Sequence, residues 1–261
     1  MEKICIVIPA YNEERRIGKT LEAYSNYFEN LRKNKYLDYE ILVVINNTKD
    51  RTEEIVKQFI KENERILYLN LKPGGKGFAV IEGFKDALKR NNDLIGFVDA
   101  DMATSPEEYW KLVKSIRNHD GVIASRWQKN SLVKNSSFIR RINSSGFNFI
   151  VRSLFLFKYK DTQCGAKLFK RKVIENIHNK LGITQWAFDI DLLYKIKLKD
   201  FKIIEIPTTW ENKEDATLNI LKAPLQMFAS VLRLRLIYSP FNFVIRSYDL
   251  LPEKIKMHNL K

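Results

Sequence analysis

The stretch FVDADMATSPEEY, residues 97–109, places two acids directly after apolar residues and just ahead of a helix start. Asp99 and Asp101 are one residue apart, so in an extended segment both side chains point to the same side. Such a pair can hold a hard divalent cation, and Mg²⁺ often takes only one or two protein carboxylates because substrate phosphates complete its shell. The pattern indicates a metal and phosphate site, although a short D-x-D pair also occurs as plain strand-end polarity.

Strand and helix patterns alternate on the N-terminal side of this stretch. Apolar, β-branched runs predict strands at 3–11, 39–45, 65–71 and 93–101, and amphipathic patterns predict helices after the first three. We expect Asn12 to cap the first helix, which then spans 12–33. Continuous apolar strands are typical of a parallel sheet covered on both faces, so the chain is predicted to be an α/β protein with a Rossmann-like, doubly wound, mostly parallel sheet.

Three polar loops follow these strands: PAYNEE at 9–14, NNTKD at 46–50 and DADM at 99–102. In open α/β sheets, ligands bind beyond the carboxyl ends of the strands. The three loops are therefore expected to converge on one site.

The pattern changes after residue 120. A short strand is expected at 121–126, a basic helix at 138–157 and a late strand at 202–212. No Gly/Ser/Pro-rich linker separates the halves. We therefore expect one catalytic domain at 1–216 with an amphipathic helical extension at 217–261.

The net charge indicates which kinds of partner the protein favours. The 261 residues include 45 Lys and Arg against 31 Asp and Glu, a formal net charge of +14, which favours anionic partners. A basic nucleic-acid-binding protein is the non-enzyme alternative, but zinc spacings, RNP-like motifs and long like-charge runs are absent from the sequence, so we expect no nucleic acid partner. Cys5 and Cys164 form no metal-like cluster or disulfide framework, which favours a reducing, cytoplasmic setting. The first residues do not resemble a signal peptide.

An ordered set of motifs covers roughly residues 3–238. In order these are IVIPAYNEE (6–14), ILVVINNTKDRT (41–52), GGKGFAVIEGF (74–84), FVDADMAT (97–104), ASR (124–126), DTQCGAKLFKR (161–171) and WAFDIDLLY (186–194). Together they resemble the family 2 inverting glycosyltransferases, and among these the polyprenyl-phosphate sugar synthases. Three of the motifs are more similar to the dolichyl-phosphate glucosyltransferases than to the mannosyl enzymes.

This resemblance implies the GT-A fold and transfer of a sugar, most simply glucose from UDP-glucose, to dolichyl or polyprenyl phosphate with inversion. It implies Mg²⁺ or Mn²⁺ on the sugar diphosphate, held by Asp99 and Asp101, with Asp101 the nearer ligand. The catalytic set implied is Asp101, Asp189 and Arg126, with Asp189 orienting the acceptor or sugar. The nucleotide-sugar contacts implied are Pro9, Ala10, Tyr11, Glu13, Asn46, Asn47, Lys76, Asp99, Ala100, Arg126 and Arg140.

Several of these residues also have plainer interpretations. Glu13 suits the first turn of a helix, where the dipole favours an acid. Asp189, and Asp191 as its alternative, suit N-terminal capping positions. Arg140 and its neighbour Arg141 are equally typical of a solvated basic face. Lys76 stands among glycines, which allow a close approach of backbone to a ligand.

Two segments depart from the family pattern. Many relatives carry Asp-Asp-Gly-Ser where this chain has Ile45, Asn46, Asn47 and Thr48, which leaves base recognition open. Asp215, Ala216 and Thr217 replace a frequent Gly-Ser-Lys, with Lys213 or Lys222 as possible substitutes. GDP-mannose or UDP-N-acetylglucosamine as donor, and a saccharide hydroxyl as acceptor, are the remaining alternatives.

A lipid acceptor requires a membrane surface. The apolar runs Ala223–Leu232 and Leu236–Ile245 stop well short of the roughly 18 residues of a spanning helix. The region contains apolar side chains at helical spacing together with four basic residues: Leu221, Leu225, Phe228, Leu232 and Leu236, with Lys222, Arg233, Arg235 and Arg246. We expect peripheral attachment to the cytosolic face of a membrane. The alternative is that this stripe packs on the core.

Overall fold

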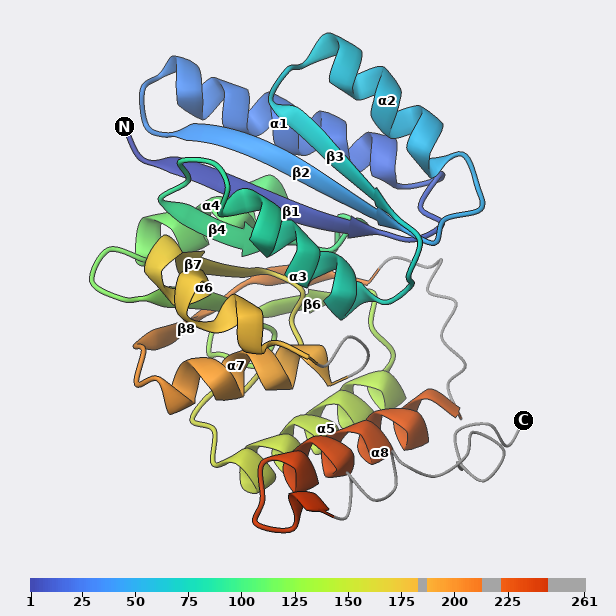
Figure 1. The fold of residues 1–261 in the computed structure, drawn as a ribbon, viewed down its shortest axis with the longest axis vertical. Coiled ribbons are helices and arrows are strands. Elements are labelled where there is room, and N and C mark those ends of the chain that lie inside the picture. Colours follow the sequence, from blue (N-terminus) through green and yellow to red (C-terminus); the bar gives the residue numbers. More distant parts are fainter. Residues whose placement is uncertain (183–186, 213–221, 244–261) are drawn as a thin grey trace.

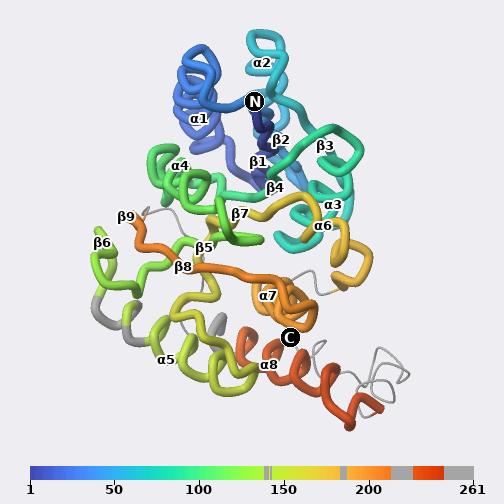
Figure 2. Tube along the Cα trace, turned by 90° about the vertical axis from the view of Figure 1, so that its left-hand side faces the viewer, coloured from blue at the N-terminus to red at the C-terminus, as the bar shows by residue number. Residues whose placement is uncertain are grey.

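The computed structural model describes residues 1–182, 187–212 and 222–243. In this part of the chain, seven strands form one sheet in the order β3-β2-β1-β4-β7-β5-β8, and β6 pairs with β9 apart from it (Figures 1 and 2). The strands are β1 Lys3–Ala10, β2 Asp38–Asn46, β3 Ile66–Leu71, β4 Leu94–Phe97, β5 Gly121–Ser125, β6 Leu132–Lys134, β7 Lys167–Lys170, β8 Ile203–Pro207 and β9 Thr209–Glu211. The helices are α1 Ile17–Lys33, α2 Thr52–Glu62, α3 Lys76–Ala87, α4 Pro106–Ser115, α5 Phe138–Phe155, α6 Arg171–Ile177, α7 Phe188–Leu198 and α8 Lys222–Ile237, with a 3₁₀ turn at His178–Lys180.

The predicted mostly parallel sheet is confirmed. β1 pairs in parallel with β2 and β4, and β2 pairs in parallel with β3. Two strands were not expected: β6 lies outside the seven-stranded sheet, and β7 lies antiparallel between β4 and β5. The four residues of β7 are too few for a clear alternation pattern, and the chain reaches the middle of the sheet only after the α5 region.

Helices cover both faces of the sheet (Figures 1 and 2). Side chains of α1, α2 and α4 pack with one face, and those of α3, α6 and α7 pack with the other. The rings of Tyr24, Phe28 and Tyr109 form the centre of the first cluster. Because both faces are buried, the strands read as continuous apolar runs rather than alternating ones.

The helix start at Ser105 is as predicted. Its side chain accepts a hydrogen bond from Glu108 N, and Pro106 occupies the first helical position. The predicted cap at Asn12 is wrong, because α1 begins only at Ile17. Asn12 adopts a left-handed conformation (φ 53°), and its Oδ1 accepts from Lys49 N at 2.9 Å. It therefore joins two loops instead of starting a helix.

A third layer, α5 and α8, lies beyond α7 (Figures 1 and 2). Val231 and Leu234 of α8 are buried against α5 and α7, whereas Phe228 and Leu232 are exposed. The described part of the C-terminal segment thus packs on the core with one side and presents apolar side chains on another. The predicted boundary at 216/217 lies outside the described residues. Within the described ranges, no helix is both long and apolar enough to cross a bilayer.

Candidate functional site

The loops after β1 and β2 meet at one edge of the sheet, as predicted. Because these strands are parallel, their carboxyl ends share this edge. Glu13 N donates to Thr52 Oγ1 at 2.8 Å, and Asn12 N donates to Thr48 Oγ1 at 3.3 Å. These bonds join segments almost forty residues apart into one rigid rim.

The turn after β4 carries the paired aspartates. Thr20 Oγ1 of α1 donates to Ala100 O at 2.6 Å, which fixes the turn against the first helix. Asp101 Oδ1 accepts from Ala103 N at 2.9 Å, and Met102 takes the left-handed conformation (φ 59°) that reverses the chain. Burial, and then the neighbouring Asp99 charge, raise the pKa of Asp101. The site therefore gains from a cation near these carboxylates.

Lys76 supplies one such cation. It opens α3, and its Nζ lies 2.5 Å from Asp99 Oδ1 and 5.7 Å from the ring centre of Phe97. Partial burial lowers the pKa of Lys76, but the carboxylates of Asp99 and Asp189 outweigh it and hold this pKa above its ordinary value. Lys76 and Asp99, both among the nucleotide-sugar contacts that the resemblance implies, thus lie together in the structure, and their contact with a substrate stays a prediction.

Two glycines allow the surrounding segments to approach closely. A Cβ added at Gly77 would lie 2.6 Å from Phe188 Cβ, so the start of α3 packs directly on the start of α7. A Cβ at Gly165 would lie 1.8 Å from Asp99 Oδ2, so the 161–165 loop closes over the aspartate. No other residue type fits at either place without displacement of its neighbour.

Asp189 is held by a buried lysine that the sequence reasoning missed. Lys167, in β7, is fully buried, and its Nζ donates to Asp189 Oδ1 at 2.5 Å and to Cys164 O at 2.6 Å. Burial of a lysine ammonium costs much free energy unless a partner of opposite charge and hydrogen-bond acceptors lie beside it. The available signal was a lysine within the apolar run of a quoted motif, which is weak without knowledge of its partner.

Arg126 forms a second buried ion pair. Its Nε and Nη2 donate to the two oxygens of Asp161 at 2.7 and 3.0 Å, and its guanidinium lies 5.4 Å from the ring centre of Trp210. Burial raises the pKa of Asp161, but Arg126 outweighs this effect and lowers it. Asp161 was also missed, although it begins the motif that carries Gly165. Asp161 fixes the orientation of Arg126. Burial lowers the pKa of Arg126, but Asp161 and the charge of Asp99 outweigh this effect and raise it.

The predicted base-binding residues differ in accessibility. The Asn46 amide is buried, and with its oxygen toward Gly75 it accepts from Gly75 N at 2.9 Å and donates to Ala10 O at 3.0 Å. Asn46 thus connects the end of β1 to the glycine turn. Asn47 is exposed and lies against Gly74. A contact of either residue with a base stays a prediction.

The remaining predicted residues of the first strand end lie at the same edge. Pro9 and Ala10 are buried within β1, and Tyr11 just after them is 52% exposed. The carboxylate of Glu13 forms two hydrogen bonds with Arg16, at 2.7 and 2.8 Å. Burial raises the pKa of Glu13 against the opposing effect of Arg16, and the charges of Asp101 and Asp99 add to the rise.

Three further predictions fall elsewhere or outside the description. Asp191 is fully buried and pairs with Lys195 and Tyr238, away from Asp189. Arg141 is exposed on α5, and the side chain of Arg140 lies outside the description. The segment Asp215–Thr217 with Lys213, and the side chain of Lys222, are also outside it.

The donor set suits a hard divalent cation. Asp99 and Asp101 offer only oxygen ligands, which Mg²⁺ and Mn²⁺ prefer. Within residues 1–182, 187–212 and 222–243, no group of three or more His, Cys, Asp or Glu side chains could hold a metal ion. A cation on the aspartate pair would therefore need further oxygens from a substrate.

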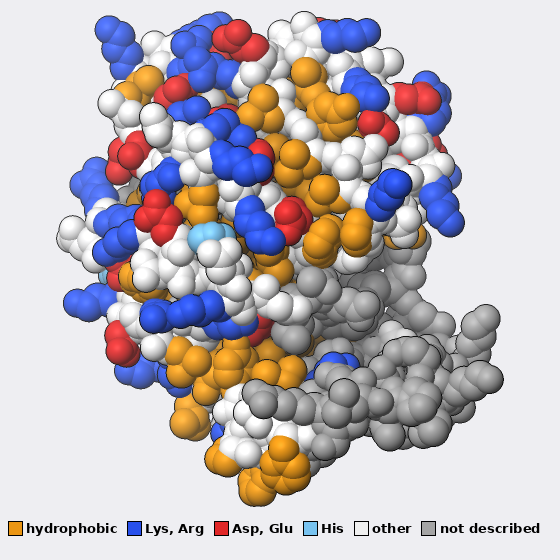
Figure 3. All heavy atoms as spheres, viewed as in Figure 1, with side chains coloured by type: hydrophobic (Ala, Val, Ile, Leu, Met, Phe, Trp, Pro, Cys, Tyr) orange, Lys and Arg blue, Asp and Glu red, His pale blue; other side chains and the backbone are white. Residues whose placement is uncertain are grey.

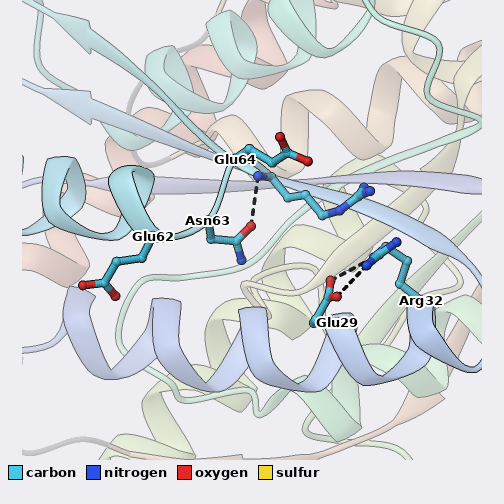
Figure 4. Close-up of a pocket in the computed structure, with 6 residues that line it drawn as sticks. Glu29, Arg32, Glu62, Asn63 and Glu64 are labelled. Atoms are coloured by element: carbon cyan, nitrogen blue, oxygen red, sulfur yellow. Dashed lines mark hydrogen bonds and ion pairs between the residues drawn. The ribbon is translucent and has the colours of Figure 1, made fainter.

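A surface depression lies away from this edge (Figure 4). Glu29, Arg32 and the segment 62–65 line it, near the last turns of α1 and α2. Arg65 pairs there with Asp38, the first residue of β2, so the depression lies at the amino edge of the sheet. Ligands of doubly wound sheets bind at the other edge.

Comparisons with known proteins identify the family of this chain. Residues 5–178 match the family model described as Glycosyl transferase family 2. A dolichyl-phosphate β-glucosyltransferase of Dictyostelium discoideum is 31% identical over 246 residues, covering 90% of this chain and 74% of the relative. The Homo sapiens protein of the same name is 30% identical over 250 residues, covering 91% and 76%.

Solved structures share the fold. Glucosyl-3-phosphoglycerate synthase from Mycobacterium tuberculosis, in complex with Mn²⁺ and UDP-glucose, aligns with a TM-score of 0.66 at 16% identity, covering 90% of this chain and 79% of that one. Mannosyl-3-phosphoglycerate synthase from Rubrobacter xylanophilus aligns with a TM-score of 0.61 at 16% identity, covering 97% and 77%. The predicted GT-A architecture is confirmed by this likeness.

Proposed function

Since the chain belongs to the family 2 glycosyltransferases, we propose that it transfers glucose from UDP-glucose to dolichyl phosphate or a related polyprenyl phosphate, with inversion. The observation that carries the proposal is the cluster of Asp99, Asp101, Lys76 and Asp189 at the carboxyl edge of the sheet. The names of relatives about 30% identical support the donor sugar and the acceptor.

The donor would lie along the rim of the first two loops. In this proposal Tyr11, Glu13 and Asn47 would contact the nucleoside. Lys76 and Arg126 would contact the diphosphate. Asp99 and Asp101 would hold Mg²⁺ or Mn²⁺, which when bound stabilises negative charge on the departing diphosphate. Lys76 contacts the Asp99 carboxylate, so its charge would also offset the negative charge of a diphosphate bound there.

The acceptor chemistry asks little of the protein. A phosphate monoester already carries about −1.5 to −2 charge at pH 7, so no strong base is required. The protein must align two anions and exclude water. Asp189, which accepts from Lys167, would orient the acceptor or the sugar.

A donor panel tests this proposal. The protein is incubated with UDP-glucose, GDP-mannose or UDP-N-acetylglucosamine, Mg²⁺ or Mn²⁺, and a polyprenyl phosphate in detergent. We expect a β-linked glucosyl lipid phosphate from UDP-glucose, identified by mass spectrometry and by the anomeric NMR coupling. A faster reaction with GDP-mannose, or transfer to a saccharide hydroxyl without lipid phosphate, contradicts it.

We also propose that the α5–α8 layer faces a bilayer. Residues 121–160 contain eight Lys and Arg and no Asp or Glu, and 222–243 contain three Arg and Lys and no acid. Phe149 of α5 is 68% exposed, and Leu156, the residue directly after this helix, is 75% exposed. Phe241 and Phe243, after α8, are 60% and 59% exposed. Figure 3 shows hydrophobic side chains at the lower end of the molecule, where α8 ends. Exposed apolar side chains within an acid-free layer suit an anionic lipid surface.

The proposal extends the predicted attachment from the C-terminal segment to α5. The cytosolic face is the side we propose, since both cysteines are buried and free. The proposed attachment is peripheral, through side chains inserted at the level of the headgroups.

Replacing Phe149 and Leu156 with serine is expected to release the protein from liposomes. Each substitution removes on the order of 1.5–3 kcal/mol of favourable free energy from burial of an apolar side chain in the membrane interface. The affinity for vesicles should therefore fall more than tenfold. Flotation with vesicles rich in anionic lipid measures the bound fraction. The control is Tyr36→Ser, because Tyr36 lies in the turn after α1 and is 67% exposed. Equal recovery of both variants and the wild type, or binding indifferent to lipid charge, argues that this layer does not meet the membrane.

A further inference from the structure

Helix α7 carries two buried acids in its first turn, and they face different partners. Asp189 pairs with Lys167 of β7, inside the sheet. Asp191 accepts from the Tyr238 hydroxyl at 2.6 Å through Oδ1 and from Lys195 Nζ at 2.8 Å through Oδ2. Tyr238 follows directly after α8. The first turn of α7 therefore links Lys167 to the end of α8.

The Tyr238 contact is specific in geometry and protonation. Its ring packs edge-on against Tyr194 with 4.7 Å between centroids, and its backbone N donates to Leu234 O at 3.2 Å. Burial, and then the charge of Asp191, raise the pKa of Tyr238, so the phenol remains a donor at neutral pH. A bond from a phenol to a buried carboxylate is charge-assisted and short.

The turn has little freedom on its other side. Gly77 brings the start of α3 against Phe188, and Asp191 N donates to Ala187 O at 2.9 Å. Lys195 lies on α7 itself, so its ion pair with Asp191 does not tie the helix to another element. Among the described residues, the Tyr238 hydroxyl is thus the polar contact that holds Asp191 from outside the helix.

We propose that Tyr238 and Asp191 are positioning residues that couple the α5–α8 layer to the orientation of Asp189. The inference rests on the proposed function, in which this layer meets the bilayer and Asp189 orients the substrates. Apolar packing of Val231 and Leu234 holds α8 near α7 but does not fix the rotation of the α7 turn. The directional bond to Asp191 does, and Asp189 lies two residues before it.

Tyr238→Phe tests the coupling, because it removes the hydroxyl and keeps the ring contact. The matched control is Tyr194→Phe, whose hydroxyl makes no hydrogen bond to a described residue. Hydrogen exchange of the amides at 188–192 and steady-state kinetics are measured on the full chain. For Tyr238→Phe we expect hydrogen exchange at 188–192 to become about tenfold faster and kcat to fall about tenfold, which corresponds to the loss of one charge-assisted bond. The KM for the sugar nucleotide should not change. Tyr194→Phe should change neither.

Three results overturn the proposal: unchanged exchange and kcat in Tyr238→Phe, the same change in both variants, or a rise in KM with kcat unaltered. The exchange measurement needs no substrate. If the wild-type protein transfers no glucose to polyprenyl phosphate, the proposed function fails, while faster exchange confined to Tyr238→Phe still supports the link between the layer and α7.

Discussion

Replacing Asp101 with alanine is expected to lower glucose transfer at least about a thousandfold, the scale on which charge stabilisation of a departing group contributes. The side chain is half-buried near the charge of Asp99, and its Oδ1 accepts from Ala103 N. Removing it takes away one of the two carboxylates that can hold a cation at this edge. Transfer assays with a Mn²⁺ titration measure the loss, and calorimetry should show that UDP binding no longer depends on the metal.

Asp101→Asn separates charge from shape. The amide oxygen can still accept from Ala103 N, so the turn should survive, while the negative charge is gone. We expect this variant to melt with the wild type and to be nearly as inactive as the alanine variant. Full turnover of Asp101→Ala in the presence of a chelator would show that neither the metal nor this carboxylate takes part.

Replacing Arg126 with methionine is expected to lower the free energy of unfolding by about 3–5 kcal/mol at pH 7. The change leaves Asp161, a fully buried carboxylate, without its cation. Arg126→Lys keeps the charge but lacks the planar guanidinium that bonds to both carboxylate oxygens. Its free energy of unfolding should therefore lie between those of the wild type and Arg126→Met. Denaturant unfolding at several pH values measures the difference.

The same pair predicts a pH dependence. Because the pKa of Asp161 in the folded protein lies below its ordinary value of 3.8, the pair stabilises the fold fully above that value. The contribution is lost as the pH falls through 3.8 and below it, where the carboxyl becomes protonated. The difference in the free energy of unfolding between the wild type and Arg126→Met should therefore become smaller in acid. A variant that unfolds with the wild type at pH 7 contradicts the assignment of Asp161 as a buried anion.

The sequence by itself determined the features that depend on near neighbours. Continuous apolar runs identified the parallel strands, and Ser105 with Pro106 identified the start of α4. The loops after β1, β2 and β4 could be placed at one edge because parallel strands leave no other arrangement. The aspartate pair and the glycine turn could be identified for the same reason, since their chemistry lies in adjacent residues.

Tertiary structure decided which charges meet. Lys167 and Asp189 are 22 residues apart, Arg126 and Asp161 are 35 apart, and Asp191 and Tyr238 are 47 apart. No periodicity links such residues, because their contact follows from how β7 enters the sheet and how α8 lies on α7. The helix cap expected at Asn12 was wrong for a related reason. The Asn12 side chain accepts from Lys49 N in the neighbouring loop, so it joins two loops and does not cap a helix. A buried charge must have a partner, but only the folded chain determines which residue that partner is.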